Sequence, residues 1–248
     1  MKKYVLRITV ILMISTLVFN CKKDEKTEPK PDPVVESIAD EMAATLSGDG
    51  SGITNEILGV MGIISESSYF LKSASLDTIY SNDTSIHITN GTGAIIKYNY
   101  SFNINYGYVF NGLALENVYY NAEINGSYDG LRIGFSETRN SEWVLTGLNL
   151  LSANYVLNGT SVRDGQSESK VGLKSQMSST SEITLNDIKI NKVTLDLTSG
   201  TLNWKINGKI NDSSYEYEAV IELIDSKTAK LSIDGNTFTI NLENGEVE

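Results

Sequence analysis

Apolar and polar residues alternate along most of the chain after residue 79, with the period of two that is expected of half-buried β-strands. In residues 96–104 the even positions are apolar or aromatic and the odd positions are polar, so one face is expected in a core and the other in water. The same alternation returns in residues 202–206 and 238–242. The pattern predicts about a dozen strands that follow one another along the chain.

Asn-Gly and Asp-Gly dipeptides separate these runs, and such pairs favour tight hairpins because they tolerate positive φ angles. They stand at residues 90–91, 111–112, 125–126, 129–130, 158–159, 164–165, 207–208, 234–235 and 244–245. We therefore predict a mostly β fold for residues 76–248. The antiparallel meander is expected to form a sandwich, a closed barrel or a half-barrel.

A helical period precedes the strands, over residues 37–75. Apolar residues recur at every fourth position from Ile38 to Leu46, and a glycine-rich segment at 47–52 ends that run. The next run begins near Thr54, a residue type suited to an N-cap, and is apolar around most of its circumference. A short helical segment is therefore predicted to pack on the sheet, within a single globular domain.

Residues 1–20 have the layout of an export signal. Three positive residues precede an apolar run at 8–19. This run is shorter than the ~20 residues that a membrane-spanning helix needs. The pattern favours cleavage before Cys21, which is the one cysteine of the sequence.

Residues 18–21 resemble a lipobox, and the next four residues resemble the surface-export signal of Bacteroidota-type lipoproteins: Lys22, Lys23, Asp24 and Glu25. The resemblance extends only to about residue 25 and implies that Cys21 carries a lipid. Several acyl chains on one residue give a stable membrane anchor. The expected location is the outer membrane, facing the cell exterior. The prolines at 29, 31 and 33 indicate an extended tether within residues 21–36.

A second short motif resembles a modification site of the same group of bacteria. Asp77-Thr78-Ile79 matches a three-residue O-glycosylation site, with Thr78 as the acceptor. Matches to the N-glycosylation pattern, such as residues 90–92, are better explained by hairpin turns.

The charge balance limits the possible partners. The sequence has 20 Lys and Arg against 31 Asp and Glu, a net charge of −11, and loss of the three positive residues in the signal gives −14. This charge argues against a nucleic-acid partner, because phosphates are bound through clustered Lys and Arg. With Cys21 lipidated, the mature chain has no cysteine nucleophile and no thiolate metal ligand.

Motifs that could carry catalysis are sparse. The one histidine, His87, falls on the polar side of an alternating segment, and no G-x-S-x-G motif accompanies it. Residues 167–170 fit the S-x-x-K pattern of penicillin-recognising enzymes, but the partner motifs of those enzymes are missing. Residues 48–52 lack the lysine of a phosphate-binding loop. The sequence therefore assigns no catalytic residue, cofactor or metal ligand, and favours a protein without enzymatic activity.

Aromatic residues concentrate between residues 98 and 128. Six of them share one strand face with Ile96 and Ile104, so we predict that they belong to the core. An aromatic face that binds a ligand is the alternative.

Three classes of function stay open. The first is a surface-exposed lipoprotein that binds or displays, with a glycan, a small ligand or another envelope protein as its partner. The second is a carrier of lipid or another hydrophobic ligand, because a curved sheet with an apolar helix would look like the half-barrel of periplasmic lipoprotein chaperones. The third is a carboxylate-based, glycan-active enzyme. A transmembrane barrel is less economical, since an anchor and a polar tether would be redundant on it.

Overall fold

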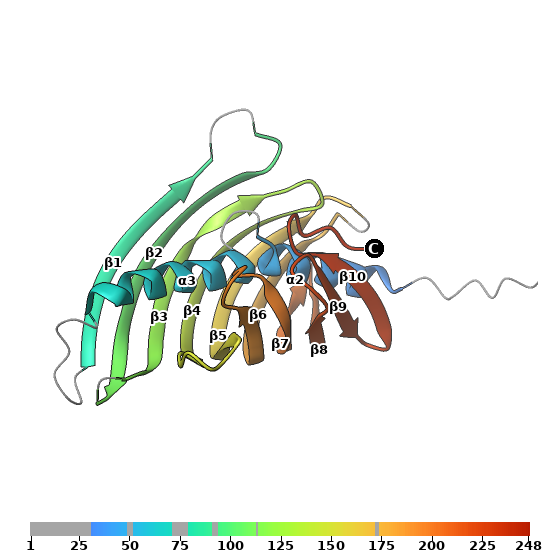
Figure 1. Ribbon diagram of the computed structural model, residues 1–248. Coiled ribbons are helices and arrows are strands. Elements are labelled where there is room, and N and C mark those ends of the chain that lie inside the picture. The colour runs from blue at the N-terminus through green and yellow to red at the C-terminus, as the bar shows by residue number, and fades with distance from the viewer. Residues whose placement is uncertain (1–30, 49–51, 71–78, 91–93, 113, 172–173) are drawn as a thin grey trace, which may run out of the picture. The chain divides into compact units, whose positions relative to one another are not determined.

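A single antiparallel sheet dominates the computed structural model, and each of its strands pairs with the next along the chain (Figure 1). The structure describes residues 31–48, 52–70, 79–90, 94–112, 114–171 and 174–248. The strands in these ranges are β1 (Ile79–Thr89), β2 (Lys97–Asn111), β3 (Ala114–Asp129), β4 (Ile133–Thr146), β5 (Asn154–Ser169), β6 (Gln176–Asn191), β7 (Leu197–Ile210), β8 (Ser213–Leu223), β9 (Thr228–Ile233) and β10 (Asn236–Asn241). The predicted mostly β, antiparallel meander is confirmed.

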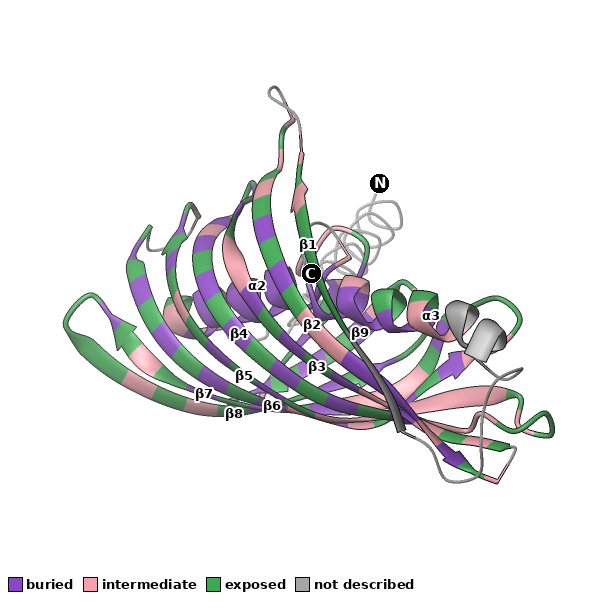
Figure 2. Cartoon of the chain, turned by 90° about the vertical axis from the view of Figure 1, so that its left-hand side faces the viewer, coloured by how far each residue is buried: buried purple, intermediate pink, exposed green. Residues whose placement is uncertain are grey.

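Buried and exposed residues alternate along the strands, so that one face of the sheet is covered and the other is open to solvent (Figure 2). In β4, for example, the odd positions from Ile133 to Leu145 are buried, and most of the even positions are exposed. The aromatic residues of β2 lie on the covered face, where Tyr100 and Tyr108 are each 1% exposed. The prediction that these aromatic residues form part of the core is therefore confirmed.

Two helices, α2 (Pro33–Leu46) and α3 (Ile53–Phe70), run across the strands on the covered face (Figure 1). Helix α2 contacts β4 and β5 as well as β9 and β10, so the sheet curls around it. The helices bury apolar side chains such as Ile38, Met42 and Val60 against the sheet. Because one open sheet makes the whole β part, the fold is neither a sandwich nor a closed barrel. It corresponds to the half-barrel alternative.

The predicted turns are only partly correct. Asn111-Gly112, Asp129-Gly130 and Asp234-Gly235 do connect neighbouring strands. Four other dipeptides lie inside strands instead, at residues 125–126, 158–159, 164–165 and 207–208. Three of these glycines lie opposite an aromatic residue of the next strand, in the pairs Tyr100–Gly126, Trp143–Gly159 and Gly208–Tyr215.

The reason for these interior glycines is steric. A Cβ atom at position 126 would lie 2.2 Å from the ring of Tyr100. One at position 208 would lie 2.0 Å from the backbone carbonyl oxygen of Ser178 and 2.9 Å from the hydroxyl oxygen of Tyr215. At Gly126 the aromatic ring occupies the space that a side chain would need, whereas at Gly159 and Gly208 the backbone of a neighbouring strand comes closest. The same Asn-Gly and Asp-Gly dipeptides occur in the tight turns and at these positions inside strands. Local sequence pattern therefore could not distinguish the two.

The helices also begin differently from the prediction. Asp32 is the N-cap of α2, where its side chain accepts a hydrogen bond from the amide of Val34 at 2.8 Å, and Pro33 fills the first turn. Residues 33–36 are therefore helical, although the sequence suggests a tether up to residue 36. Helix α3 starts at Ile53, so Thr54 lies in its first turn and is not the N-cap.

Two glycines of α3 face open space. Gly59 and Gly62 are exposed, and a Cβ atom at either position would meet nothing within 4 Å. Neither helix, over the residues that the structure describes, is long and apolar enough to cross a membrane.

Candidate functional site

A groove of about 1110 Å³ crosses five neighbouring strands, β4 to β8, on the face opposite the helices. Its floor is a transverse row of residues in register across the sheet: Glu137, Gly165, Ser179, Gly208 and Tyr215. The side chains of this row point to the covered face, so their backbone lines the groove. Five strands at a spacing of about 4.8 Å give the groove a length of roughly 19 Å.

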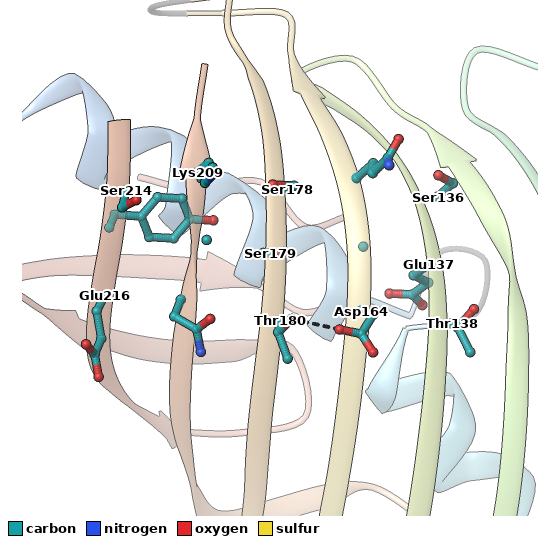
Figure 3. A pocket seen from close by; sticks show the side chains of 15 residues that line it. Ser136, Glu137, Thr138, Asp164, Ser178, Ser179, Thr180, Lys209, Ser214 and Glu216 are labelled. Atoms are coloured by element: carbon teal, nitrogen blue, oxygen red, sulfur yellow. Dashed lines mark hydrogen bonds between the residues drawn. The ribbon is translucent and has the colours of Figure 1, made fainter. Parts of the chain in front are cut away.

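Two ladders of exposed polar side chains flank this floor (Figure 3). The first ladder consists of Thr138, Asp164, Thr180, Asn207 and Glu216, and the second consists of Ser136, Gln166, Ser178, Lys209 and Ser214. Within the first ladder, the hydroxyl of Thr180 donates to the carboxylate of Asp164 at 2.7 Å. Hydroxyls, amides, two carboxylates and one ammonium group thus present both donors and acceptors along the whole groove.

Directly behind the groove floor, on the covered face, five charged side chains form a continuous chain of ion pairs: Glu56, Arg139, Glu137, Arg163 and Glu41. The guanidinium of Arg139 donates to Glu56 at 3.1 Å and to Glu137 at 3.2 Å. The guanidinium of Arg163 donates to the other oxygen of Glu137 and to Glu41, the latter at 2.5 Å. Every one of these side chains is at most 1% exposed. The chain of charges joins α3 to β4, β4 to β5, and β5 to α2.

Serine hydroxyls complete the hydrogen bonding at the α2 end of this ionic chain. Glu41 accepts hydrogen bonds from Ser179 at 2.6 Å and from Ser167 at 3.1 Å. Arg163 also donates to Ser179 at 3.1 Å, and its guanidinium lies 5.1 Å from the centre of the Phe135 ring. The buried carboxylate of Glu41 is therefore held by three partners, as buried charges require.

Gly165 gives the ionic chain the room that it needs. A Cβ atom at this position would lie 2.7 Å from Nη2 of Arg163. The guanidinium therefore lies over the backbone of its own strand, two residues away. The sequence suggests that the Asp164-Gly165 dipeptide is a turn. In the structure the glycine lies inside β5, and its missing side chain leaves space for the buried guanidinium of Arg163.

Burial shifts the pKa values of the chain of charges. Burial in the interior raises the pKa of Glu56 above its ordinary value of 4.5, while Arg139 and the neighbouring Ser141 and Tyr120 act in the opposite direction. Burial alone would lower the pKa of Arg163, but Glu41 and Glu137 more than offset it, so its pKa is raised and it stays charged. With three glutamates and two arginines, the fully ionised chain has one excess negative charge.

Replacing Glu56 with glutamine is expected to raise the melting temperature relative to wild type by an amount that grows with pH. A carboxyl group whose pKa is raised by folding stabilises the protein below its unfolded pKa, and this stabilisation is lost as the pH rises through the folded value. Glutamine cannot ionise, so the variant does not lose this stability as the pH rises, and it keeps the shape of the side chain. Thermal unfolding measured from pH 4 to pH 9 tests the prediction.

The matched control is Glu218→Gln, because Glu218 is 79% exposed and pairs with Lys205 at 3.8 Å. That variant is expected to follow the wild-type pH dependence. If the advantage of Glu56→Gln shrank as the pH rose, the charge account of this position would be wrong.

The residues that the sequence singles out are not brought together at one place. Cys21, the export signal at residues 22–25 and Thr78 lie outside the described residues. His87 is exposed on β1. The S-x-x-K pattern is divided by the sheet, since Ser167 bonds to Glu41 on the covered face while Lys170 pairs with Asp129 at the surface.

The ionic chain was not predicted, although the sequence carries a signal for it. Glu137 and Arg139 have the same odd parity as Ile133, Phe135 and Trp143, which places them on the covered face of β4. Charged residues at core positions of an alternating strand indicate buried pairs. Their partners could not be read from the sequence, because Glu41 and Glu56 lie about 80 to 120 residues away along the chain.

In comparisons with known proteins, no family model, no curated protein and no solved structure matches the chain.

Proposed function

We propose that this chain is a lipid-anchored, surface-exposed protein of the outer membrane that binds a hydroxyl-rich ligand, such as a glycan, without catalysis. The observation that carries the proposal is the groove across β4 to β8 with its two polar ladders. The anchor and the exposed location rest on the resemblance of the first 25 residues or so to a surface-exported lipoprotein.

The chemistry of the groove supports a polyhydroxylated ligand. Serine and threonine hydroxyls both donate and accept hydrogen bonds, as sugar hydroxyls do, and the amides of Gln166 and Asn207 add both kinds of group. Asp164, Glu216 and Lys209 leave one excess negative charge in the exposed lining, which argues against an anionic polymer. The groove crosses the strands, so an extended chain would meet donors and acceptors along its whole length.

A carrier of lipid is the alternative that the half-barrel shape suggests. Such a carrier needs a vacant apolar surface inside the curve of the sheet. In this protein α2 and α3 cover that surface, with Met42 and Val60 each 0% exposed and the ionic chain joining both helices to the sheet. Lipid binding would require the helices to leave, which would expose two buried arginines.

A carboxylate-based enzyme is the other alternative. The exposed carboxylates of the groove are Asp164 on β5 and Glu216 on β8, which lie in one ladder but three strands apart. Three strand spacings of about 4.8 Å put them roughly 14 Å apart, beyond the separations of about 5–9.5 Å that glycoside hydrolysis uses. Binding without catalysis therefore fits the groove better.

Binding of fluorescent oligosaccharides to intact cells that carry the full chain tests this proposal. Wild-type cells are expected to bind at least one oligosaccharide of a neutral panel. The double variant Gln166→Ala/Asn207→Ala removes one amide from each ladder and is expected to weaken binding about tenfold, since each hydrogen bond contributes about 0.5–1.5 kcal/mol. Cys21→Ala is expected to remove binding from the cells while the purified chain still binds.

Asn203→Ala is the matched control, because Asn203 is exposed on the same face of β7 but lies outside the groove. It is expected to bind as wild type does. The groove assignment fails if no oligosaccharide binds or if the double variant binds as well as this control. The anchor assignment fails separately if Cys21→Ala cells still bind.

A further inference from the structure

The two edge strands of the sheet, β10 and β1, differ in what pairs with their outer side. At one edge, β10 is covered by the chain's own C-terminal residues 246–248. The amide of Thr239 donates to the carbonyl of Glu248 at 2.8 Å, and the amide of Glu248 donates back at 2.9 Å. At the other edge, β1 has β2 as its one strand neighbour among the residues that the structure describes.

Strand β1 also lacks the features that usually protect an edge. It is 11 residues long, contains no proline or lysine, and pairs with β2 along its whole length without a shift in register. Natural edges are protected by shortness, by lysine or proline, or by a bulge. A long, regular and unprotected edge is therefore a surface for pairing with another strand.

The exposed side chains of β1 indicate what kind of strand would pair. Residues 83–87 are all exposed, and Ile86 is a large apolar side chain that is 45% exposed on the covered face of the sheet. The ionisable side chains between residues 83 and 89 are Asp83 and His87. An apolar centre flanked by a hydrogen-bond acceptor, Asp83, and a hydrogen-bond donor, His87, is self-complementary.

We propose that β1 pairs antiparallel with β1 of a second copy of this chain, about a two-fold axis that lies midway between the two copies of Ile86. A two-fold axis normal to the sheet keeps each side chain on its own face, so one residue of the strand must lie directly opposite its own symmetry mate. In this register Ile86 meets its own symmetry mate, Thr84 faces Ile88, and Ser85 faces His87. No like charges lie opposite each other, and Asp83 is diagonal to His87, whose ring N–H is a hydrogen-bond donor for the carboxylate.

Disulfide cross-linking of the full chain in intact cells tests this pairing. Directly opposite residues of an antiparallel pair have Cα atoms about 4.5–5.5 Å apart, which a disulfide can span. Ile86→Cys is expected to give a dimer on non-reducing gels after mild oxidation, well above the wild-type background. Val220→Cys, at a position 46% exposed on the interior strand β8, is expected to stay at background.

A second pair of variants tests the register. Thr84→Cys alone should not cross-link, because the two copies of residue 84 are four residues apart along the strands, about 13 Å. Thr84→Cys expressed together with Ile88→Cys should cross-link. The proposal is overturned if Ile86→Cys forms no more dimer than Val220→Cys, or if Thr84→Cys alone cross-links as well as the mixed pair.

Discussion

Replacing Arg163 with methionine is expected to lower the free energy of unfolding by about 3–5 kcal/mol. Arg163 is 0% exposed, and its guanidinium is the shared partner of Glu41 on α2 and Glu137 on β4. Methionine fills much of the same volume but leaves both carboxylates buried without their main cation. The loss of stability comes from these buried, unpaired carboxylates and not from lost apolar contact. Urea denaturation followed by tryptophan fluorescence measures it, because Trp143 and Trp204 are both buried.

Two further variants separate charge from packing at this position. Lys205→Met removes the cation of an exposed pair with Glu218, at 3.8 Å, and is expected to cost at most about 1 kcal/mol. Adding Glu41→Gln to Arg163→Met is expected to recover part of the lost free energy of unfolding, since one of the two unpaired buried carboxylates is removed. If the double variant were as unstable as the sum of its single variants, lost packing would explain the result better than charge.

Replacing Gly159 with alanine is expected to cost about 3–5 kcal/mol. The backbone of Gly159 has a φ of +151°, and a Cβ atom there would lie 2.2 Å from the carbonyl oxygen of Glu142 and 2.7 Å from Cα of Trp143. Both contacts are with backbone of the neighbouring strand, so β4 and β5 would have to separate. Trp143, whose indole N–H donates to Ser161 at 3.1 Å, would be displaced with them. The same denaturation measurement tests this prediction.

Gly235→Ala is the control for the backbone angle alone. Gly235 has a φ of +73° in the turn between β9 and β10, and a Cβ atom there would meet nothing within 4 Å. It is expected to lose only about 1–2 kcal/mol, the cost of a left-handed conformation for a residue with a side chain. A loss at Gly159 no larger than the loss at Gly235 would mean that the strands accommodate the new methyl group.

The ionic chain gives the half-barrel its defined arrangement of helices on the sheet. Apolar contacts between helix and sheet are not directional, so they alone would allow α2 and α3 to slide across the strands. Hydrogen bonds between charged groups are directional, and Glu41 meets Arg163 and Glu56 meets Arg139 only when each helix lies in one place. The groove floor lies on the same transverse row as Glu137 and Ser179, so the chain of charges also fixes the strands that carry the two polar ladders.

The sequence by itself determined the antiparallel strands, the aromatic core of β2 and the two helices. These features are local, because a period of two or of about four residues is written into consecutive positions. Local pattern also predicted hairpins at residues 111–112 and 234–235. The same pattern failed at residues 158–159 and 207–208, because only the tertiary structure shows that backbone atoms of a neighbouring strand occupy the space beside each glycine.

Only the tertiary structure decided that the sheet stays open, that α2 and α3 fill its curve, and where the candidate site lies. The ionic chain pairs Glu41 with Arg163 across 122 residues, and the groove gathers side chains from five strands. Each ladder contains single Ser, Thr, Asn, Gln, Asp, Glu or Lys residues that have no motif in the sequence. They become one surface because strand register, set by burial of the opposite face, brings them into line.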